Sequence, residues 1–240
     1  MKEVSSDSFF NGRIQIRQNQ SGYRFSIDAV LLAYHARPRP ADRVLDLGTG
    51  CGIIPLIMAF RNPGIQVYGI EVQEDLSDLA AVNVRENQMQ ERVSILCKDM
   101  QALKADMIAG RVDLVVCNPP YRKSNSGRLN PDHQRAVARH EIKASLIDVI
   151  STAQRLLRVA GRFVVIYTAE RTAELLTQMR ADRIEPKMLR CIHSDRHSEA
   201  KLVLVEGVKG GRPGIRIEPP LILYDHTGAY TPEVTRMFEP

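Results

Sequence analysis

The sequence predicts an α/β fold in which helices cover both faces of a doubly wound, mostly parallel sheet. Short apolar segments alternate with segments of helical character between residues 43 and 117, and further apolar segments follow up to residue 206. Glycine, proline or acidic residues follow several of the apolar segments, as expected where buried strands end. This order of segments indicates βαβ units in a single domain, with its main part expected at 41–240.

Residues 1–40 are expected to pack on that core as a hairpin and a helix. The hairpin is predicted over 9–18, around the turn-forming pair Asn11-Gly12. Ser26 is expected to cap the helix that follows. One face of this helix is predicted to consist of Ile27, Val30, Leu31 and Tyr34. The segment 37–40, which contains two prolines, then separates the helix from the first core strand.

The predicted sheet has seven strands. They are expected near 43–47, 66–71, 92–97, 112–117, 163–167, 187–193 and 200–206. The helices between them are expected near 53–61, 74–88, 101–109, 144–158 and 170–181. A chain of 240 residues, 44% of them hydrophobic, is large enough to bury the core that such a sheet requires.

Composition excludes several classes of protein. No apolar run approaches the roughly 18 residues of a membrane-spanning helix, and the first residues lack the apolar core of a signal peptide. The four cysteines show no Cys-x-x-Cys pairing, so we expect small core residues in a reducing compartment and no zinc site. They are Cys51, Cys97, Cys117 and Cys191. The net charge of +5 favours an anionic partner.

A glycine-rich turn follows the first predicted core strand, at 48–52. Glycines let the backbone turn sharply and approach a ligand closely. A dinucleotide-binding fingerprint requires a third glycine where this chain has Ile53, and a phosphate-binding Walker loop requires a Gly-Lys pair that is absent. The remaining pattern is Asp46-x-Gly48-x-Gly50-x-Gly52.

Acidic and amide side chains follow the next three predicted strands. Glu71 ends the second strand, Asp99 and Met100 follow the third, and Asn118 follows the fourth. In a doubly wound sheet the carboxyl ends of the strands form the ligand site. We therefore expect one pocket to gather Gly48 and these side chains.

The segment Asn118-Pro119-Pro120-Tyr121 is suited to holding a planar group with an exposed amine. The prolines have fixed φ, and Pro119 keeps Asn118 extended. The amide oxygen of Asn118 and a nearby backbone carbonyl can then face one point, which the ring of Tyr121 can cover. The alternative interpretation is a buried strand that simply ends in a Pro-Pro turn.

The glycine-rich pattern resembles the first motif of class I S-adenosylmethionine-dependent methyltransferases. This resemblance implies a Rossmann-like methyltransferase fold and S-adenosylmethionine as cofactor. It implies that Glu71 accepts hydrogen bonds from the ribose hydroxyls and that Asp99 accepts one from the adenine amine. The cofactor-binding residues it implies are Asp46, Gly48, Gly50, Gly52, Glu71, Asp99, Met100 and Asn118.

Further segments resemble the bacterial tRNA(Val) adenine-N(6)-methyltransferase family over nearly the whole chain. They are 22–32, 118–121, 138–141, 184–187, 202–211, 218–221 and 230–231. The resemblance implies methylation of the 6-amine of an adenine beside a tRNA anticodon, by a cytoplasmic enzyme with tRNA as partner and without a metal or a membrane. The implied catalytic residues are Asn118, Pro119, Pro120 and Tyr121.

A basic segment follows the predicted clamp and is expected to hold RNA phosphates. We assign substrate binding to Tyr121, Arg122, Lys123 and Arg128. Other cations of this segment are Arg135, Arg139 and Lys143, and Lys209, Arg212 and Arg216 of the glycine-rich tail are expected to add to the same face. His133 and His140 are given no role, because methyl transfer to an aromatic amine needs no strong base.

Three alternatives remain open. A protein methyltransferase acting on a glutamine amide nitrogen uses the same clamp, although that family usually has an N-terminal helical domain. A ribosomal RNA guanine-amine methyltransferase is the second alternative, although phenylalanine more often replaces the tyrosine there. The third is a non-catalytic RNA-binding protein of the same fold, which the intact motifs disfavour.

Overall fold

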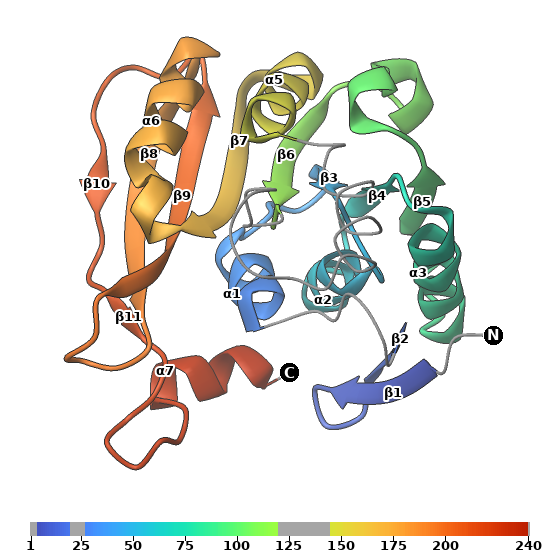
Figure 1. Ribbon diagram of the computed structural model, residues 1–240. Helices are drawn as coiled ribbons and strands as arrows, with labels where there is room; N and C mark the ends of the chain where they lie inside the picture. Colours follow the sequence, from blue (N-terminus) through green and yellow to red (C-terminus); the bar gives the residue numbers. More distant parts are fainter. Residues whose placement is uncertain (1–3, 20–26, 120–144, 240) are drawn as a thin grey trace, which may run out of the picture.

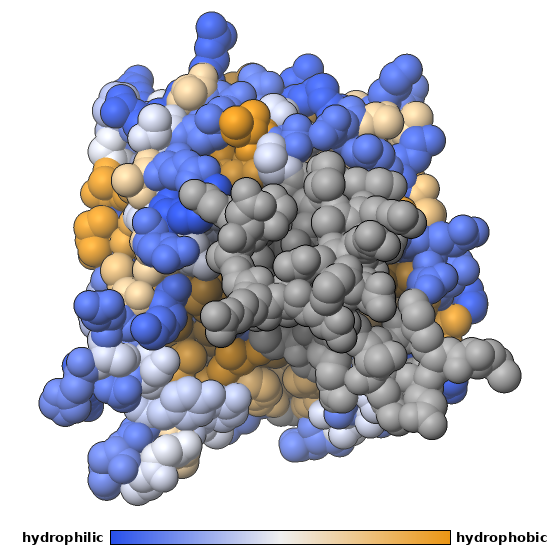
Figure 2. All heavy atoms as spheres, in the orientation of Figure 1, coloured by the Kyte–Doolittle hydropathy of each residue, from blue (hydrophilic) through white to orange (hydrophobic). Residues whose placement is uncertain are grey.

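A computed structural model describes residues 4–19, 27–119 and 145–239. Within these ranges, nine strands form one twisted sheet with helices on both faces, and a separate hairpin packs beside it (Figure 1). No helix in these ranges is both long enough and apolar enough to cross a membrane. Hydrophilic residues predominate on the coloured surface in Figure 2, as expected for a face in contact with water.

The seven long strands of this sheet lie in the order β5-β4-β3-β6-β7-β9-β8, which confirms the predicted fold class. They are β3 (Arg43–Leu47), β4 (Gln66–Glu71), β5 (Val93–Cys97), β6 (Val112–Cys117), β7 (Leu157–Thr168), β8 (Ile184–His193) and β9 (Ala200–Lys209). The first five pair in parallel, whereas β9 is antiparallel to both β7 and β8. Two short strands that the sequence did not predict, β10 (Arg216–Ile217) and β11 (Leu221–Ile222), extend the β8 edge.

Helices of the βα units and the terminal segments cover the two faces of the sheet. The α-helices are α1 (Ile27–His35), α2 (Ile53–Arg61), α3 (Glu74–Glu86), α5 (Leu146–Leu156), α6 (Thr172–Ala181) and α7 (Pro232–Thr235). The 3₁₀ helices are η1 (Met100–Ala102), η2 (Ala105–Ile108), η3 (Ala169–Arg171) and η4 (Arg236–Phe238). The central strands are buried on both faces, which explains their nearly continuous apolar sequences.

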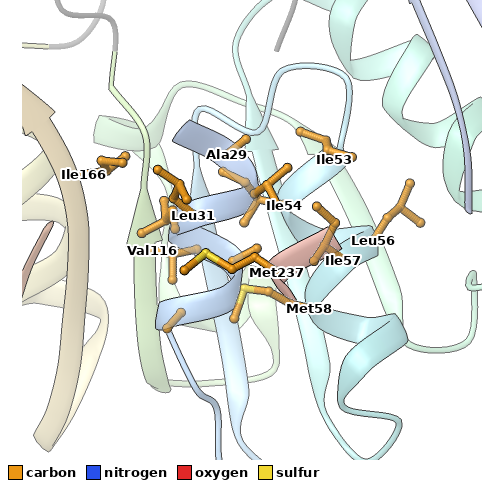
Figure 3. Close-up of a cluster of buried hydrophobic side chains, with 14 of the residues drawn as sticks. Ala29, Leu31, Ile53, Ile54, Leu56, Ile57, Met58, Val116, Ile166 and Met237 are labelled. Carbon is orange, nitrogen blue, oxygen red and sulfur yellow. The ribbon is translucent and has the colours of Figure 1, made fainter. Parts of the chain in front are cut away.

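The core on one face joins α1, α2 and the C-terminal segment. Figure 3 shows Met237 of η4 among side chains of α1 and α2, with Val116 of β6 and Ile166 of β7 in the same cluster. The other face is covered by α5 and α6, and Phe163 and Leu175 belong to its core.

The predicted helix is present as α1, and it is buried on nearly all sides, not only on the face that was predicted to consist of apolar residues. Ile27 and Tyr34, which were expected on that face, are the partly exposed residues, and the other residues of the helix are buried. The reason is that α2, β7 and η4 all contact this helix. Ser26, the expected cap, lies outside the described residues.

The helix predicted near 101–109 is replaced by the two short 3₁₀ helices η1 and η2. Leu103 and Lys104, which separate them, have extended backbones. Arg155 of α5 donates hydrogen bonds to the backbone carbonyls of Met100, at 3.0 Å, and Leu103. A continuous helix would use these carbonyls internally, so the long-range contact with α5 competes with it.

The predicted hairpin is present as β1 (Val4–Phe9) and β2 (Ile14–Asn19). Asn11 and Gly12 have φ of 56° and 82°, the left-handed values that a tight hairpin turn requires. Ile14 and Ile16 are fully buried against the sheet domain. The division into an N-terminal part at 1–40 and a core at 41–240 stays a prediction.

Candidate functional site

Sheet register brings the predicted site residues of three strands to one edge. Leu47 at the end of β3 pairs with Ile70 of β4 on one side and with Cys117 of β6 on the other. Gly48, Glu71 and Asn118 each follow directly after these paired residues in the sequence. The three residues therefore lie side by side at the carboxyl edge, where doubly wound folds bind ligands.

The glycine turn between β3 and α2 depends on backbone conformations that favour glycine. Gly48, Gly50 and Gly52 have φ of 75°, 57° and 85°. The backbone N–H groups of Gly48 and Thr49 both donate to the Ile70 carbonyl at 2.9 Å, which holds the turn against β4. A Cβ on Gly52 would lie 3.2 Å from the Cβ of Ala80, so α3 also packs closely against the turn.

Glu71, at the end of the neighbouring strand β4, binds the backbone in the middle of the turn. Its Oε2 accepts a hydrogen bond from the Gly50 N–H at 3.0 Å, and its Oε1 accepts one from the Gln73 N–H at 2.9 Å. The side chain is buried. A carboxylate has about four acceptor positions, so Glu71 retains capacity for hydroxyl donors from a ligand.

Asp46 is fully buried beneath the same turn. Among the described residues, neither carboxylate oxygen receives a hydrogen bond of ordinary geometry, although the Thr49 side chain lies close enough to lower the pKa of this carboxyl. Burial raises the pKa of Asp46 to about 7, and the negative charge of Glu71 acts in the same direction. A buried carboxylate without an ion-pair partner is costly, and a cationic ligand group beside it would lower its pKa and stabilise its charge.

Asp99 lies just beyond β5 at the same edge. Its Oδ1 accepts a hydrogen bond from the Gln101 N–H at 2.9 Å and so caps η1. Met100 follows it and is partly buried against the core. Cys97 is exposed, which corrects the expectation of a buried thiol, whereas Cys51 and Cys117 are buried as predicted.

The predicted clamp begins at the end of β6 and is only partly within the described residues. Asn118 is partly exposed and Pro119 is buried. The Cys117 thiol donates to the Leu47 carbonyl at 3.1 Å and ties this strand end to β3. The remaining predicted residues of the clamp and of the basic rim lie outside the described residues: Pro120, Tyr121, Arg122, Lys123 and Arg128.

Lys209, which was expected to add to the basic rim, lies far from the glycine turn. It pairs with Ile184 at the start of β8, which is the opposite edge of the sheet from the glycine turn. Its Nζ donates to the backbone carbonyl of Leu157 at 2.9 Å and to that of Gln154. These contacts satisfy carbonyls at the end of α5, and burial lowers the pKa of Lys209.

Two residues that the sequence reasoning missed support the site. Arg155 holds the segment that follows Asp99, through the carbonyl contacts described above. Asn83 of α3 donates to the Cys51 carbonyl, inside the glycine turn, at 2.8 Å. Asparagine is unfavourable in a helix interior. An asparagine on the buried face of the predicted helix 74–88 is therefore the sequence feature that could have indicated this role. Among residues the structure describes, no group of three or more His, Cys, Asp or Glu is placed to hold a metal.

The fold and the site together define a class: an α/β protein that holds a nucleoside-type cofactor at a glycine turn on the carboxyl edge of its sheet. Residues 21–182 match the model of the methyltransferase small domain family, and the chain belongs to this family. A curated relative from Porphyromonas gingivalis ATCC 33277, a tRNA1(Val) (adenine(37)-N6)-methyltransferase, is 33% identical, over 99% of this chain and 95% of its own length. A relative of the same name from Tolumonas auensis is 26% identical, over 96% and 94%. The resemblance found in the sequence is thereby confirmed.

Solved structures agree with this assignment. A predicted O-methyltransferase from Agrobacterium tumefaciens is similar with a TM-score of 0.71 and 25% identity, over 88% of this chain and 94% of that one. The geranyl diphosphate C-methyltransferase from Streptomyces coelicolor, solved with S-adenosyl-L-homocysteine, gives a TM-score of 0.54 at 17% identity, over 75% and 76%. The latter likeness concerns the fold alone.

Proposed function

We propose that this protein is an S-adenosylmethionine-dependent methyltransferase that acts on the exocyclic 6-amine of an adenine in tRNA. The observation that carries the proposal is the glycine turn held by Glu71 above the fully buried carboxyl of Asp46, with Asn118 at the adjacent strand end. The activity stated in the names of its relatives supports the choice of substrate.

The residues at the turn fit this cofactor. S-adenosylmethionine, when bound, supplies a methyl group on a positively charged sulfur. Asp46 offers a buried carboxyl to a cationic group, and Glu71 offers its remaining acceptor positions to hydroxyls. The three glycines let the backbone approach a ligand without side chains in the way. Asp99, Met100 and Asn118 are proposed to line the base end of the site.

We assign the amine-holding step to Asn118 and Pro119. The side-chain oxygen of Asn118 and the carbonyl of Pro119 accept the two amine hydrogens. This draws the nitrogen lone pair out of conjugation with the ring and makes the amine a better nucleophile. Positive charge develops on the nitrogen during transfer, so both acceptors bind the transition state more strongly than the substrate. Pro120 keeps the segment rigid, and Tyr121 stacks on the base.

The proposed RNA site is the predicted basic rim. Arg122, Lys123 and Arg128 would contact phosphates around the flipped adenine, whose extrusion is least costly from a single-stranded loop. We propose the anticodon loop of tRNA(Val) as that loop and the adenine beside the anticodon as the target, by analogy with the relatives' names. We also propose that the enzyme is cytoplasmic, because its proposed substrate is tRNA.

A labelling experiment tests the proposal. Unmodified tRNA is incubated with the protein and methyl-labelled cofactor, digested to nucleosides and separated. Label in N6-methyladenosine is the expected result. Label in a guanine nucleoside, or transfer only to a protein substrate, would replace the adenine assignment with the corresponding alternative, and cofactor binding without any transfer would indicate a non-catalytic protein.

A further inference from the structure

Asn83 lies between two parts of the chain that are far apart in the sequence: hairpin β1–β2 and the glycine turn. Its side chain is fully buried near the end of α3. Oδ1 accepts from the Arg17 N–H at 2.8 Å, while Nδ2 donates to the Arg17 carbonyl at 2.9 Å and to the Cys51 carbonyl at 2.8 Å. The amide thus uses both of its donors and bridges the hairpin to the turn.

A second asparagine makes the same contact with the hairpin but does not reach the turn. Asn87 accepts from the Gln15 N–H at 2.9 Å, and donates to the Gln15 carbonyl at 2.7 Å. Its third contact is the carbonyl of Asn83, at 2.7 Å. This side chain is at the exposed end of the contact between α3 and β2.

The spacing of the two asparagines matches the spacing of the strand. Four residues of helix rise about 6 Å, and two residues of strand rise about 6.6 Å. Asn83 and Asn87 therefore reach alternate residues of β2, Arg17 and Gln15, along the edge that faces away from β1. The two amides take the place of a neighbouring strand and satisfy backbone groups that an edge strand would leave unpaired. Figure 1 shows the hairpin against this end of α3.

The glycine turn is consequently held from two sides. Glu71 binds the Gly50 N–H from β4, and Asn83 binds the Cys51 carbonyl from α3. Close packing of Ala80 on Gly52 brings α3 near enough for this contact. The orientation of the peptide groups that approach the cofactor thus depends on both side chains.

We propose that Asn83 is a positioning residue that couples the order of the N-terminal hairpin to the affinity of the glycine turn for the cofactor. The inference rests on the proposed function, because it takes S-adenosylmethionine as the ligand of the turn. Coupling between two sites is reciprocal, so cofactor binding must also stabilise the hairpin, and Asn83 must transmit that effect.

The test compares Asn83→Asp with Asn87→Asp in the full chain. Each substitution keeps the side-chain shape and removes the amide donors, but only the first one removes a contact with the turn. We expect Asn83→Asp to weaken S-adenosylmethionine binding in calorimetry about tenfold, as for loss of a buried hydrogen bond. Turnover at saturating cofactor should change much less. Asn87→Asp should leave the affinity within about twofold of wild type, well under the loss of one hydrogen bond.

Hydrogen exchange separates coupling from simple loss of stability. In the wild-type protein, the cofactor should slow exchange of the β2 amides, and this response should disappear in Asn83→Asp while it persists in Asn87→Asp. Equal loss of affinity in both variants, or wild-type affinity in Asn83→Asp, overturns the proposal. Failure of the wild-type protein to bind S-adenosylmethionine would instead reject the proposed function itself.

A second pair of variants keeps the test decisive if Asn83→Asp does not fold, as judged by circular dichroism. Arg17→Pro removes the N–H that binds Asn83, and Gln15→Pro removes the N–H that binds Asn87. Both N–H groups point away from β1, where proline is tolerated in an edge strand. The larger loss of cofactor affinity is expected for Arg17→Pro, and equal losses contradict the coupling through Asn83.

Discussion

Replacing Asp46 with asparagine should make the ligand-free protein more stable at high pH while it weakens cofactor binding. The folded pKa of Asp46 is about 7, above the ordinary value of 3.8, because the carboxyl is fully buried. A carboxyl with a raised folded pKa contributes stability that is lost as the pH rises through that pKa. The ligand-free fold should therefore lose stability from Asp46 between about pH 5 and pH 8.

The size of this loss follows from linkage. From pH 5 to a pKa of about 7, the folded state retains a proton that the unfolded state has released. Each pH unit in this interval is worth about 1.4 kcal/mol, so the loss is about 3 kcal/mol. Asparagine keeps the shape and does not titrate. The difference in unfolding free energy between Asp46→Asn and wild type should therefore shift by about 3 kcal/mol in favour of the variant from pH 5 to pH 8.

Cofactor binding should show the opposite effect of the same substitution. Only the ionised carboxyl is expected to bind the cationic cofactor well. With a pKa of about 7, about nine-tenths of the protein has this ionised carboxyl at pH 8 and about one-tenth has it at pH 6. Wild-type affinity should therefore fall about tenfold between these two pH values. The Asp46→Asn variant should bind weakly at both.

Urea unfolding without ligand at pH 5 and pH 8, and calorimetric titration with S-adenosylmethionine, measure the two effects. Asp113→Asn is the matched control. Asp113 is at the other end of the sheet, where partial burial raises its pKa but the Arg43 N–H and Arg158 lower it overall. Its substitution should destabilise the protein at pH 8 and leave cofactor affinity unchanged. The reasoning is refuted if Asp46→Asn lowers stability at pH 8, or binds cofactor with the wild-type pH profile.

Three further predictions concern the cofactor, the reaction and the RNA. Glu71→Ala should weaken S-adenosylmethionine binding by roughly 1–3 kcal/mol in calorimetry, because hydroxyl acceptors and the Gly50 contact are lost; unchanged affinity would remove Glu71 from the site. Asn118→Ala should lower kcat through a loss of about 2.7–4 kcal/mol of transition-state stabilisation, with a smaller effect on KM. An effect confined to KM would contradict its role. Tyr121→Phe should retain most activity, whereas Tyr121→Ala should not. The combined change of Arg122, Lys123 and Arg128 to alanine should weaken tRNA binding and flatten its salt dependence, without affecting cofactor affinity; an unaltered salt slope would place the RNA elsewhere.

The parts of the site that could be predicted from sequence are those fixed by local pattern. Gly48, Gly50 and Gly52 appear as a turn because left-handed backbone favours glycine, and Glu71 and Asn118 follow apolar strands whose parallel pairing brings their ends together. The alternation of strands and helices predicts the doubly wound, mostly parallel sheet, but it does not specify the order of the strands or the antiparallel direction of β9.

The remaining features depend on contacts between distant segments. Asn83 gains its role from Arg17 and Cys51, and no spacing within α3 specifies those partners. Likewise, η1 and η2 replace a regular helix where Arg155 binds the carbonyls of Met100 and Leu103. Lys209 binds carbonyls at the end of α5, on the edge opposite the site. Such long-range hydrogen bonds override local propensity, so they become visible only in the folded structure.

Mass mapping of methylated nucleosides in tRNA(Val) tests the central claim most directly. The tRNA is isolated from a strain that lacks the gene and from the same strain supplied with wild-type protein or with Asn118→Ala. We expect the adenine beside the anticodon to be unmethylated in the deletion strain, N6-methylated with the wild-type protein, and largely unmethylated with Asn118→Ala. A fully methylated adenine in the deletion strain, or full rescue by Asn118→Ala, would contradict the account.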